Sequence, residues 1–477
     1  MTFDSIKIRL LLLFVNITAI VFGQSLDQGR KSYNEGDYAT AKPVFEKYVQ
    51  ISPKDASYNL WYGVCLYATG ELEAAEKYLA FAVSKKVPEA YSYLGQLYFR
   101  TYRFGEAAEV YEAFIDLQKK KRENTEPYEK QLILMQKANR MLENTEDIQI
   151  IDSMIVDKND ILSAYHLSPE SGRLHYFDDF FENDQLEPGN TVYLNQRANR
   201  VLFSFGNRNT SYDLFILDKN MEGWTDDQRL PVNINSEKNE KYPFTLTDGV
   251  TLYFASDKEG TIGGYDLYVT RFNTNTNTYL NPEQLGMPFN SIYNDYLMVI
   301  DEVKGVGWFA SDRFQPEGKV IVYTFIPNDS KKIIESDSIE YKQSRAMITF
   351  IEESWRPQAD YTEIQQKART VVVREEKKRD FIFAINDHTT YYTLNDFKDQ
   401  TALNLFIKAQ QTRESLAEIT KQLQQMRETY SKGSQEEKKQ LTNSILTMES
   451  RQEQLEAEIQ RLEVLTRNTE IKFINKK

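Results

Sequence analysis

The stretch "LYFASDKEGTIGGYDLYV" (Leu252–Val269) decides the fold of the middle of this chain. Two runs of β-forming residues flank a loop that holds three glycines and an aspartate. A phosphate-binding glycine loop must lead from a strand into a helix, because the N–H groups at the helix start contact the anion. Here the glycines lead into "YDLYVT" (265–270), which reads as a strand. The segment therefore predicts a strand–turn–strand unit whose glycines supply turn conformations.

The same loop is also a poor calcium site. A calcium loop needs oxygen ligands at alternate positions and ends in a bidentate glutamate. Asp257, Glu259 and Asp266 do not have this spacing. The preceding unit, "GNRNTSYD" (206–213), keeps Tyr212 and Asp213 but has lost the paired glycines before them. The loop is therefore predicted to be a connection between strands rather than an ion site.

Strand–turn–strand units recur around this stretch. They read "AYHLSPESGRLHYF" (164–177), "VYLNQRANRVLFSF" (192–205), "YPFTLTDGVTLYFAS" (242–256) and "DYLMVIDEVKGVGWFAS" (295–311). The last three are each followed by a polar loop and a further β run, at 212–217, 265–270 and 320–325. A spacing near 50 residues with about four strands per unit is typical of β-propeller blades.

The pairing of "LYFASD" with "YDLY" resembles the TolB-type, WD-repeat-like propeller over residues 159–328. The resemblance implies a central propeller within 150–398. Three blades are well marked, whereas ring closure needs at least four. Strands at Thr370–Glu375 and Asp380–Asn386 either supply another blade or belong to a small separate module, so 330–398 stays unassigned.

Residues 25–120 repeat with a different period. Gly29, Gly36, Ala41 and Phe45 recur as Gly63, Gly70, Ala75 and Leu79, and then as Gly95, Ala107 and Tyr111 with a turn expected to be shortened around Tyr102–Phe104. Small residues mark helix contacts, and Pro53 ends a helix. The pattern resembles the tetratricopeptide repeat. It predicts an α-helical solenoid over 25–147, closed by a helix at Glu126–Glu143.

The C-terminal region is predicted to be a coiled-coil hairpin over 401–470. Apolar residues step by three and four along two segments, at 416–430 and 441–462. The stretch between them is polar and contains Gly433, so a turn is expected at Ser431–Gln435. The alternative is one long helix that pairs between chains. The fold class is therefore multidomain α + β: helical solenoid, β-propeller and helical hairpin.

The N-terminus has the pattern of a processing signal. Lys7 and Arg9 precede an apolar run, Leu10–Phe22, that is too short to span a bilayer. We therefore expect a signal peptide at 1–23 and export to the periplasm. Cys65, the only cysteine, lies far beyond the cleavage point, so the chain is not expected to be a lipoprotein. A net charge of -13 argues against nucleic-acid binding.

The sequence holds few residues suited to catalysis. The three histidines, His166, His175 and His388, are scattered, and no zinc-binding spacing is present. His166 and His175 flank one predicted turn, where they either share a metal or are ordinary strand residues. No nucleophile-elbow motif occurs, and no pair of carboxylates stands out as acid and base. The chain is predicted to be no enzyme and to need no metal or cofactor.

The best candidate binding site lies in the repeats. Tyr33, Tyr67 and Phe99 occupy equivalent positions in the three first helices. The tetratricopeptide resemblance implies that this face lines a concave, peptide-binding groove, with Arg30, Gln96 and Arg100 on the same face. The alternative is that the three rings pack in the core. The basic pattern that captures a free C-terminus is absent.

An exported tetratricopeptide stack joined to a TolB-like propeller resembles envelope proteins of Bacteroidota, some of which accompany type IX secretion and gliding machinery. Members there often end in an OmpA-like peptidoglycan-binding domain, where this chain has its predicted coiled coil. The resemblance implies a non-catalytic periplasmic scaffold, associated with the outer membrane, that binds envelope proteins or peptides. Two alternatives stay open. One is a propeller enzyme or binding protein for carbohydrate or peptide, and the other is an adaptor that self-associates through the coiled coil.

Overall fold

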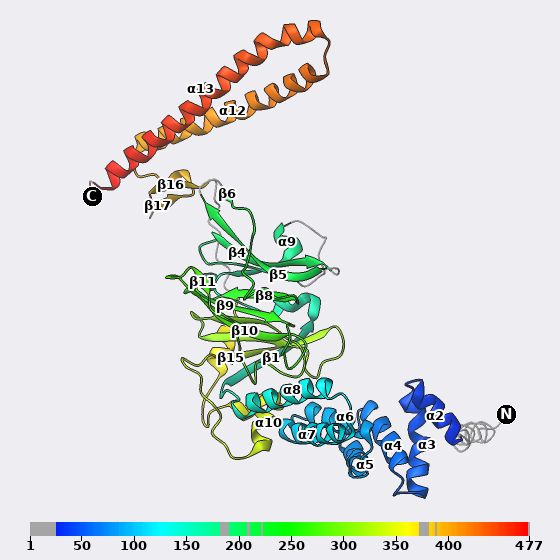
Figure 1. The fold of residues 1–477 in the computed structure, drawn as a ribbon. Helices are drawn as coiled ribbons and strands as arrows, with labels where there is room; N and C mark the ends of the chain where they lie inside the picture. The colour runs from blue at the N-terminus through cyan, green and yellow to red at the C-terminus, as the bar shows by residue number, and fades with distance from the viewer. Residues whose placement is uncertain are drawn as a thin grey trace, which may run out of the picture. The chain divides into compact units, whose positions relative to one another are not determined.

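The computed structural model describes residues 25–181, 190–207, 210–220, 223–371, 381–386 and 389–475. The chain divides into two compact units, Met1–Val372 and Val373–Lys477 (Figure 1). The predicted signal peptide, His388 and residues 372–380 lie outside the described ranges. Within those ranges, no helix has both the length and the apolarity needed to cross a bilayer.

The first unit begins with a stack of helices, coloured blue to cyan in Figure 1. They are α2 (Leu26–Asn34), α3 (Tyr38–Ile51), α4 (Ala56–Ala68), α5 (Leu72–Ser84), α6 (Pro88–Arg100), α7 (Phe104–Lys121) and α8 (Glu126–Glu143). Ser25, Asp37 and Asp55 accept hydrogen bonds from backbone N–H groups at the starts of α2, α3 and α4. The predicted helical N-terminal region is confirmed: three helix pairs are followed by α8.

Each first helix of a pair carries a glycine where its second helix approaches. A Cβ atom at Gly29 would lie 2.6 Å from Val44 Cγ1, and one at Gly63 would lie 2.9 Å from Leu79 Cγ. At Gly95 it would lie 2.6 Å from Tyr111 Cε2. These contacts are shorter than a side chain allows, so the glycine spacing in the sequence reflects close helix packing.

The expected shortening of the third turn is wrong. Gly36 and Gly70 have φ values of 79° and 87°, and Tyr102 takes the same place in the third pair with φ 60°. The third turn therefore has the same left-handed residue, supplied by a tyrosine. Of the two missing residues, one is lost from the loop before α6, which spans 85–87 where the loop before α4 spans 52–55, and the other from α5, which has 13 residues where α3 has 14.

The rest of the first unit is rich in sheet. The strands are β1 (Gln149–Asp157), β2 (Arg173–Tyr176), β3 (Thr191–Leu194), β4 (Arg200–Asn207), β5 (Thr210–Asn220), β6 (Gly223–Trp224), β7 (Gln228–Arg229), β8 (Glu240–Thr245), β9 (Thr251–Ser256), β10 (Asp266–Asn273), β11 (Thr278–Tyr279), β12 (Glu283–Gln284), β13 (Asp295–Asp301), β14 (Val306–Ser311) and β15 (Lys319–Ile326). Short helices accompany them: η2 (Lys158–Ala164), η3 (Pro169–Ser171), α9 (Phe177–Phe181), α10 (Ile339–Met347), η4 (Ile351–Ser354) and α11 (Thr362–Arg369).

These strands form three antiparallel sheets. Their orders are β2-β3-β4-β5-β6 with β7 on β5, β11-β10-β9-β8 with β12 on β10, and β1-β15-β14-β13. The strand that precedes all the others, β1, completes the last sheet by pairing with β15. Among the described strands of this unit there is no ring of four or more sheets, the minimum for a closed propeller.

Two asparagines per junction tie consecutive sheets together. The side chain of Asn235 accepts from Leu214 N at 2.8 Å and donates to Leu214 O at 3.0 Å. At the next junction Asn290 makes the same pair of bonds with Leu267, at 2.7 and 3.0 Å. Each amide therefore imitates the backbone of an extra strand residue.

The second asparagine of each junction lies four residues further on. Asn239 accepts from Tyr212 N, and Asn294 accepts from Tyr265 N. The segments "NSEKNE" (235–240) and "NSIYND" (290–295) thus form a repeated structural motif that the sequence analysis did not recognise.

The glycine-rich loop joins β9 to β10, as predicted. The reason for its glycines is corrected, because only Gly260 has a left-handed φ, at 89°. A Cβ atom on Gly263 would lie 1.8 Å from Tyr293 O, and one on Gly264 would lie 2.0 Å from Asn294 Oδ1. These two glycines are required because the linker into the third sheet passes against them.

Asp266 holds the same loop in place. Its carboxylate accepts from Ile262 N at 2.9 Å, from Gly263 N at 3.3 Å and from Gln284 Nε2 at 2.6 Å. Burial raises the pKa of Asp266 to about 7, and the nearby Asp295 carboxylate adds to this rise, whereas the two backbone donors oppose it. Asp266 thus fixes the conformation of the glycine-rich loop.

The raised pKa of Asp266 predicts a pH dependence of stability. The native state binds the proton more tightly than the unfolded state, where the ordinary value is 3.8. The contribution of Asp266 to the free energy of unfolding is therefore greatest below about pH 4 and falls as pH rises towards about 7. Asp266→Asn should flatten this part of the curve, measured by urea unfolding at several pH values.

Asp160→Asn, at an exposed aspartate of η2, is the matched control and should leave the curve unchanged. Parallel curves for the parent and Asp266→Asn between pH 4 and pH 7 would contradict the assignment.

The second unit contains two long helices and a small hairpin of strands. Its elements are β16 (Phe383–Asn386), β17 (Thr389–Tyr391), η5 (Leu394–Asp396), α12 (Gln400–Lys432) and α13 (Gln435–Ile474). The ion pairs Arg413–Glu463 and Arg427–Glu449 show that the helices run antiparallel. They turn at Gly433 and Ser434, inside the predicted turn region.

The base of the helical hairpin is joined to the strand pair. The buried Glu470 carboxylate accepts from Tyr391 Oη at 2.7 Å, from Lys398 N at 2.6 Å and from Asp399 N at 3.1 Å. The side chains of β16 and β17 pack with Phe406 of α12. The strand expected near 380–386 thus pairs within the second unit, with β17.

Candidate functional site

The first helices α2, α4 and α6 share a face that carries linked aromatic residues. Tyr33 of α2 donates from its hydroxyl to Glu89 Oε1 of α6 at 3.0 Å. Tyr67 of α4 donates to Gln96 Oε1 of α6 at 3.3 Å. Both rings are half-buried, so they pack on neighbouring helices and also present an edge to solvent. We call this surface the aromatic face.

Two arginines lie over rings of the aromatic face. The Arg30 guanidinium is 4.9 Å from the centre of the Trp61 ring, and the Arg100 guanidinium is 5.1 Å from the centre of the Tyr67 ring. Both arginines are exposed. Stacking on a ring restrains a long side chain while its N–H groups stay available to a ligand.

Phe99 is half-buried like Tyr33 and Tyr67 but makes different contacts. Its ring packs edge-on against Phe104 at 5.2 Å, in the cluster that includes Tyr102, Ile262 and Met287. That cluster joins the repeats to the sheets. Of the three predicted aromatic residues, the structure thus brings Tyr33 and Tyr67 together with Arg30, Gln96 and Arg100, whereas Phe99 packs against the cluster at the sheets and against residues of α7 and α8.

Three members of the aromatic face were missed by the sequence analysis: Trp61, Tyr93 and Glu89. Trp61 packs near Tyr33, with ring centres 6.4 Å apart, and Tyr93 packs edge-on to Tyr67 at 5.6 Å. Trp61 and Tyr93 could have been predicted from the sequence, because they stand at equivalent positions of the second and third repeats. The repeat spacing did not indicate Glu89.

Burial shifts the pKa of a tyrosine on the aromatic face and of a cysteine in the core of the repeats. Burial and the Glu89 carboxylate raise the pKa of Tyr33 well above its ordinary value, so the hydroxyl stays a donor. Burial raises the pKa of the Cys65 thiol to about 12, which leaves it unreactive at neutral pH. The face can offer ring edges, guanidinium donors and one carboxylate to a peptide.

The histidines hold no metal site within the described residues, where no group of three or more His, Cys, Asp or Glu side chains could hold an ion. His175 packs beside the Phe180 ring at 5.5 Å. Burial lowers the pKa of both His166 and His175, so both are neutral at pH 7. They behave as packed strand and loop residues.

Comparison with known proteins adds one finding. Residues 33–86 match the tetratricopeptide repeat family. The matched region runs from the end of α2 to the loop before α6 and includes Tyr33, Trp61 and Tyr67. No curated protein and no solved structure matches the chain. Similarity to tetratricopeptide repeats suggests that the helical stack binds other proteins.

Proposed function

We propose that this chain is a non-catalytic scaffold that binds protein partners through the aromatic face of its repeats. The observation that carries the proposal is the pair of exposed arginines stacked on Trp61 and Tyr67, beside tyrosines whose hydroxyls are already tied to α6. Such a surface is ordered before a partner arrives, so little conformational entropy is lost on binding.

The junction between repeats and sheets supports a scaffold role. Tyr102, Phe104, Ile262 and Met287 form one buried cluster, and Lys137 Nζ of α8 donates to Gly260 O of the glycine-rich loop at 2.5 Å. Gln343 Nε2 of α10 also donates to Tyr102 O at 3.1 Å. A partner bound to the repeats would thus be held in a fixed relation to the sheets.

The finer parts of the proposal concern the sheets and the cellular location. We propose that the sheets are blades of a TolB-type propeller. The recurring asparagine motif and the completion of the last sheet by β1 support this. A closed ring needs at least four sheets, one more than the three that the described strands of this unit form. We also propose export and a place in an envelope assembly such as a secretion or motility complex. That part rests on the N-terminal sequence pattern and on the resemblance stated above.

Reversing the two stacked charges tests the scaffold proposal. Arg30→Glu with Arg100→Glu should weaken capture of partners from envelope membranes by at least about tenfold, since each charge-assisted contact contributes about 1.5–3 kcal/mol. The tagged mature chain is used as bait, and bound proteins are quantified by mass spectrometry.

The matched control reverses two exposed lysines away from the aromatic face, Lys47→Glu with Lys54→Glu. This variant has the same net charge and should capture partners normally. Equal capture by the two double variants would show that the aromatic face is not the binding surface. Circular dichroism checks that both keep their helices.

A further inference from the structure

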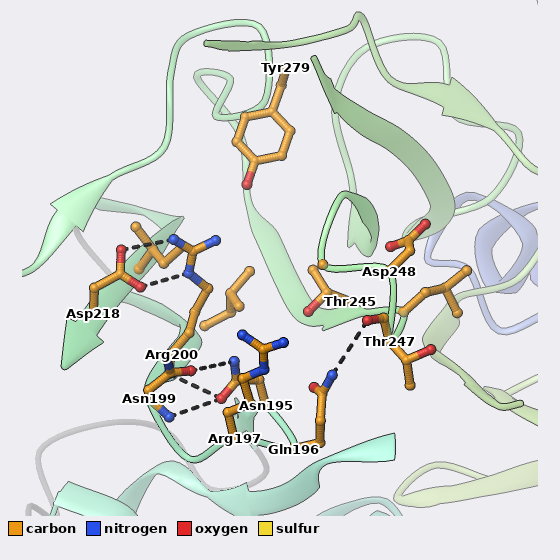
Figure 2. A pocket seen from close by; sticks show the side chains of 14 residues that line it. Asn195, Gln196, Arg197, Asn199, Arg200, Asp218, Thr245, Thr247, Asp248 and Tyr279 are labelled. Atoms are coloured by element: carbon orange, nitrogen blue, oxygen red, sulfur yellow. Dashed lines mark hydrogen bonds and ion pairs between the residues drawn. The ribbon is translucent and has the colours of Figure 1, made fainter. Parts of the chain in front are cut away.

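A polar pocket lies between the first and second sheets, outside the aromatic face (Figure 2). It encloses about 280 Å³ and is bordered by the β3–β4 turn, the β8–β9 turn and Tyr279 of β11. This volume is near the lower end for ligand pockets, which is about 300 Å³, so it suits a ligand the size of one sugar or amino acid.

The acidic groups of the pocket already have partners. Asp218 accepts a two-point ion pair from Arg200, with distances of 2.6 and 2.9 Å. Asp248 accepts from Val250 N and Thr251 N at 2.9 Å each and from the Thr251 hydroxyl at 2.6 Å. Neither carboxylate is therefore left to repel an anion strongly.

The donors of Arg197 and Tyr279 have no partner in the described part of the chain. The Arg197 guanidinium makes no hydrogen bond or ion pair there, and neither does the Tyr279 hydroxyl. Figure 2 shows both groups directed towards the middle of the pocket. Arg197 is placed by a tight turn in which Asn195 Oδ1 accepts from Asn199 N and Arg200 N, at 3.0 and 3.1 Å.

The corresponding turns at the next junction are joined more closely. There Glu302, from the β13–β14 turn, accepts from both the backbone N–H and the hydroxyl of Thr247. At the first junction the turn residue Gln196 makes only a long contact, 3.4 Å, to Thr247 O. The facing turns are thus bonded through a carboxylate at the second junction and only through one long amide contact at the first.

We propose that this pocket binds a small hydroxyl-rich carboxylate, the chemistry of a sugar acid, with Arg197 pairing to the carboxylate. A guanidinium matches a carboxylate through two parallel hydrogen bonds. The remaining amide, hydroxyl and paired charged groups suit sugar hydroxyls. An apolar amino-acid side chain would instead bury polar groups without replacing their bonds to water. The inference is independent of the scaffold proposal.

Titration of the mature chain with glucuronate, glucose and acetate tests the assignment, followed by calorimetry or by nuclear magnetic resonance. Glucuronate should bind more tightly than glucose, which lacks the carboxylate, and than acetate, which lacks the hydroxyls. Arg197→Ala should weaken glucuronate binding by at least about tenfold. Arg197→Lys keeps the positive charge but cannot donate two parallel hydrogen bonds from one planar group. Its Kd for glucuronate should therefore lie between those of the parent and of Arg197→Ala.

Arg451→Ala, at an exposed arginine of α13, is the control for loss of one positive charge and should bind as the parent does. The proposal is overturned if glucuronate does not bind at about 10 mM, well above a useful affinity. It is equally overturned if glucose binds as well as glucuronate, or if Arg197→Ala retains the parent Kd with an unchanged thermal midpoint.

Discussion

Arg313→Met should destabilise the sheets by about 3–5 kcal/mol, because it leaves one member of a buried ion pair without its partner. Arg313 and Asp295 are both fully buried, with Nη2 and Oδ1 2.8 Å apart. Arg313 also donates to the backbone oxygens of Pro288 and Phe289, at 2.9 and 3.2 Å. The loss is measured by urea unfolding followed through tryptophan fluorescence.

The matched control is Arg229→Met. Arg229 makes a two-point ion pair with Asp213 of comparable length, 2.9 and 2.8 Å, but its side chain is 45% exposed. Water screens that pair, so its loss should cost no more than about 1 kcal/mol. If the two variants lost the same free energy of unfolding, burial would not be the reason for the large contribution of the Arg313–Asp295 pair. The double variant Arg313→Met with Asp295→Leu removes both charges and should recover much of the lost stability.

Tyr102→Ala should have the second large effect, about 3–5 kcal/mol, because it empties the space of a fully buried aromatic side chain. Tyr102 packs with Phe104 at 5.2 Å in the cluster that joins helices to sheets. Its loss should therefore also uncouple the two regions. In a urea titration, the helical circular dichroism signal of Tyr102→Ala should disappear at a lower urea concentration than that of the parent protein.

Tyr102→Phe is the control that keeps the ring. The Tyr102 hydroxyl makes no hydrogen bond of ordinary geometry among the described residues and has only the Ile292 backbone N–H nearby, so removing it should change the free energy of unfolding little. An alanine variant as stable as the phenylalanine variant would show that the cluster does not hold the repeats to the sheets.

Much of the aromatic face could be predicted from the sequence, because equivalent positions of successive repeats lie on the same face of the helical stack. Tyr33 and Tyr67 stand at equivalent positions of successive helices, and successive first helices lie side by side, so their rings had to share a face. Phe99 has the same repeat position but a different neighbour. Its ring packs against Phe104 at the start of α7 and against the cluster that joins the repeats to the sheets.

Local pattern by itself determined the helix pairs, the strands flanking the glycine-rich loop, and the turn near Gly433. Each of these depends on residues a few positions apart, through helix packing, alternation of side chains and backbone conformation. The repeated glycines at 29, 63 and 95 are the clearest case, since each touches its own partner helix.

Only the tertiary structure decided which distant segments meet. Gly263 and Gly264 are required by a segment that arrives about thirty residues later, through the Tyr293 backbone and the Asn294 side chain, and β1 pairs with β15 across the whole sheet region. Arg197 lines the pocket between the first two sheets with residues of the β8–β9 turn, about fifty positions further along the chain. Such contacts depend on how the sheets pack against one another, and no spacing along the sequence encodes that packing.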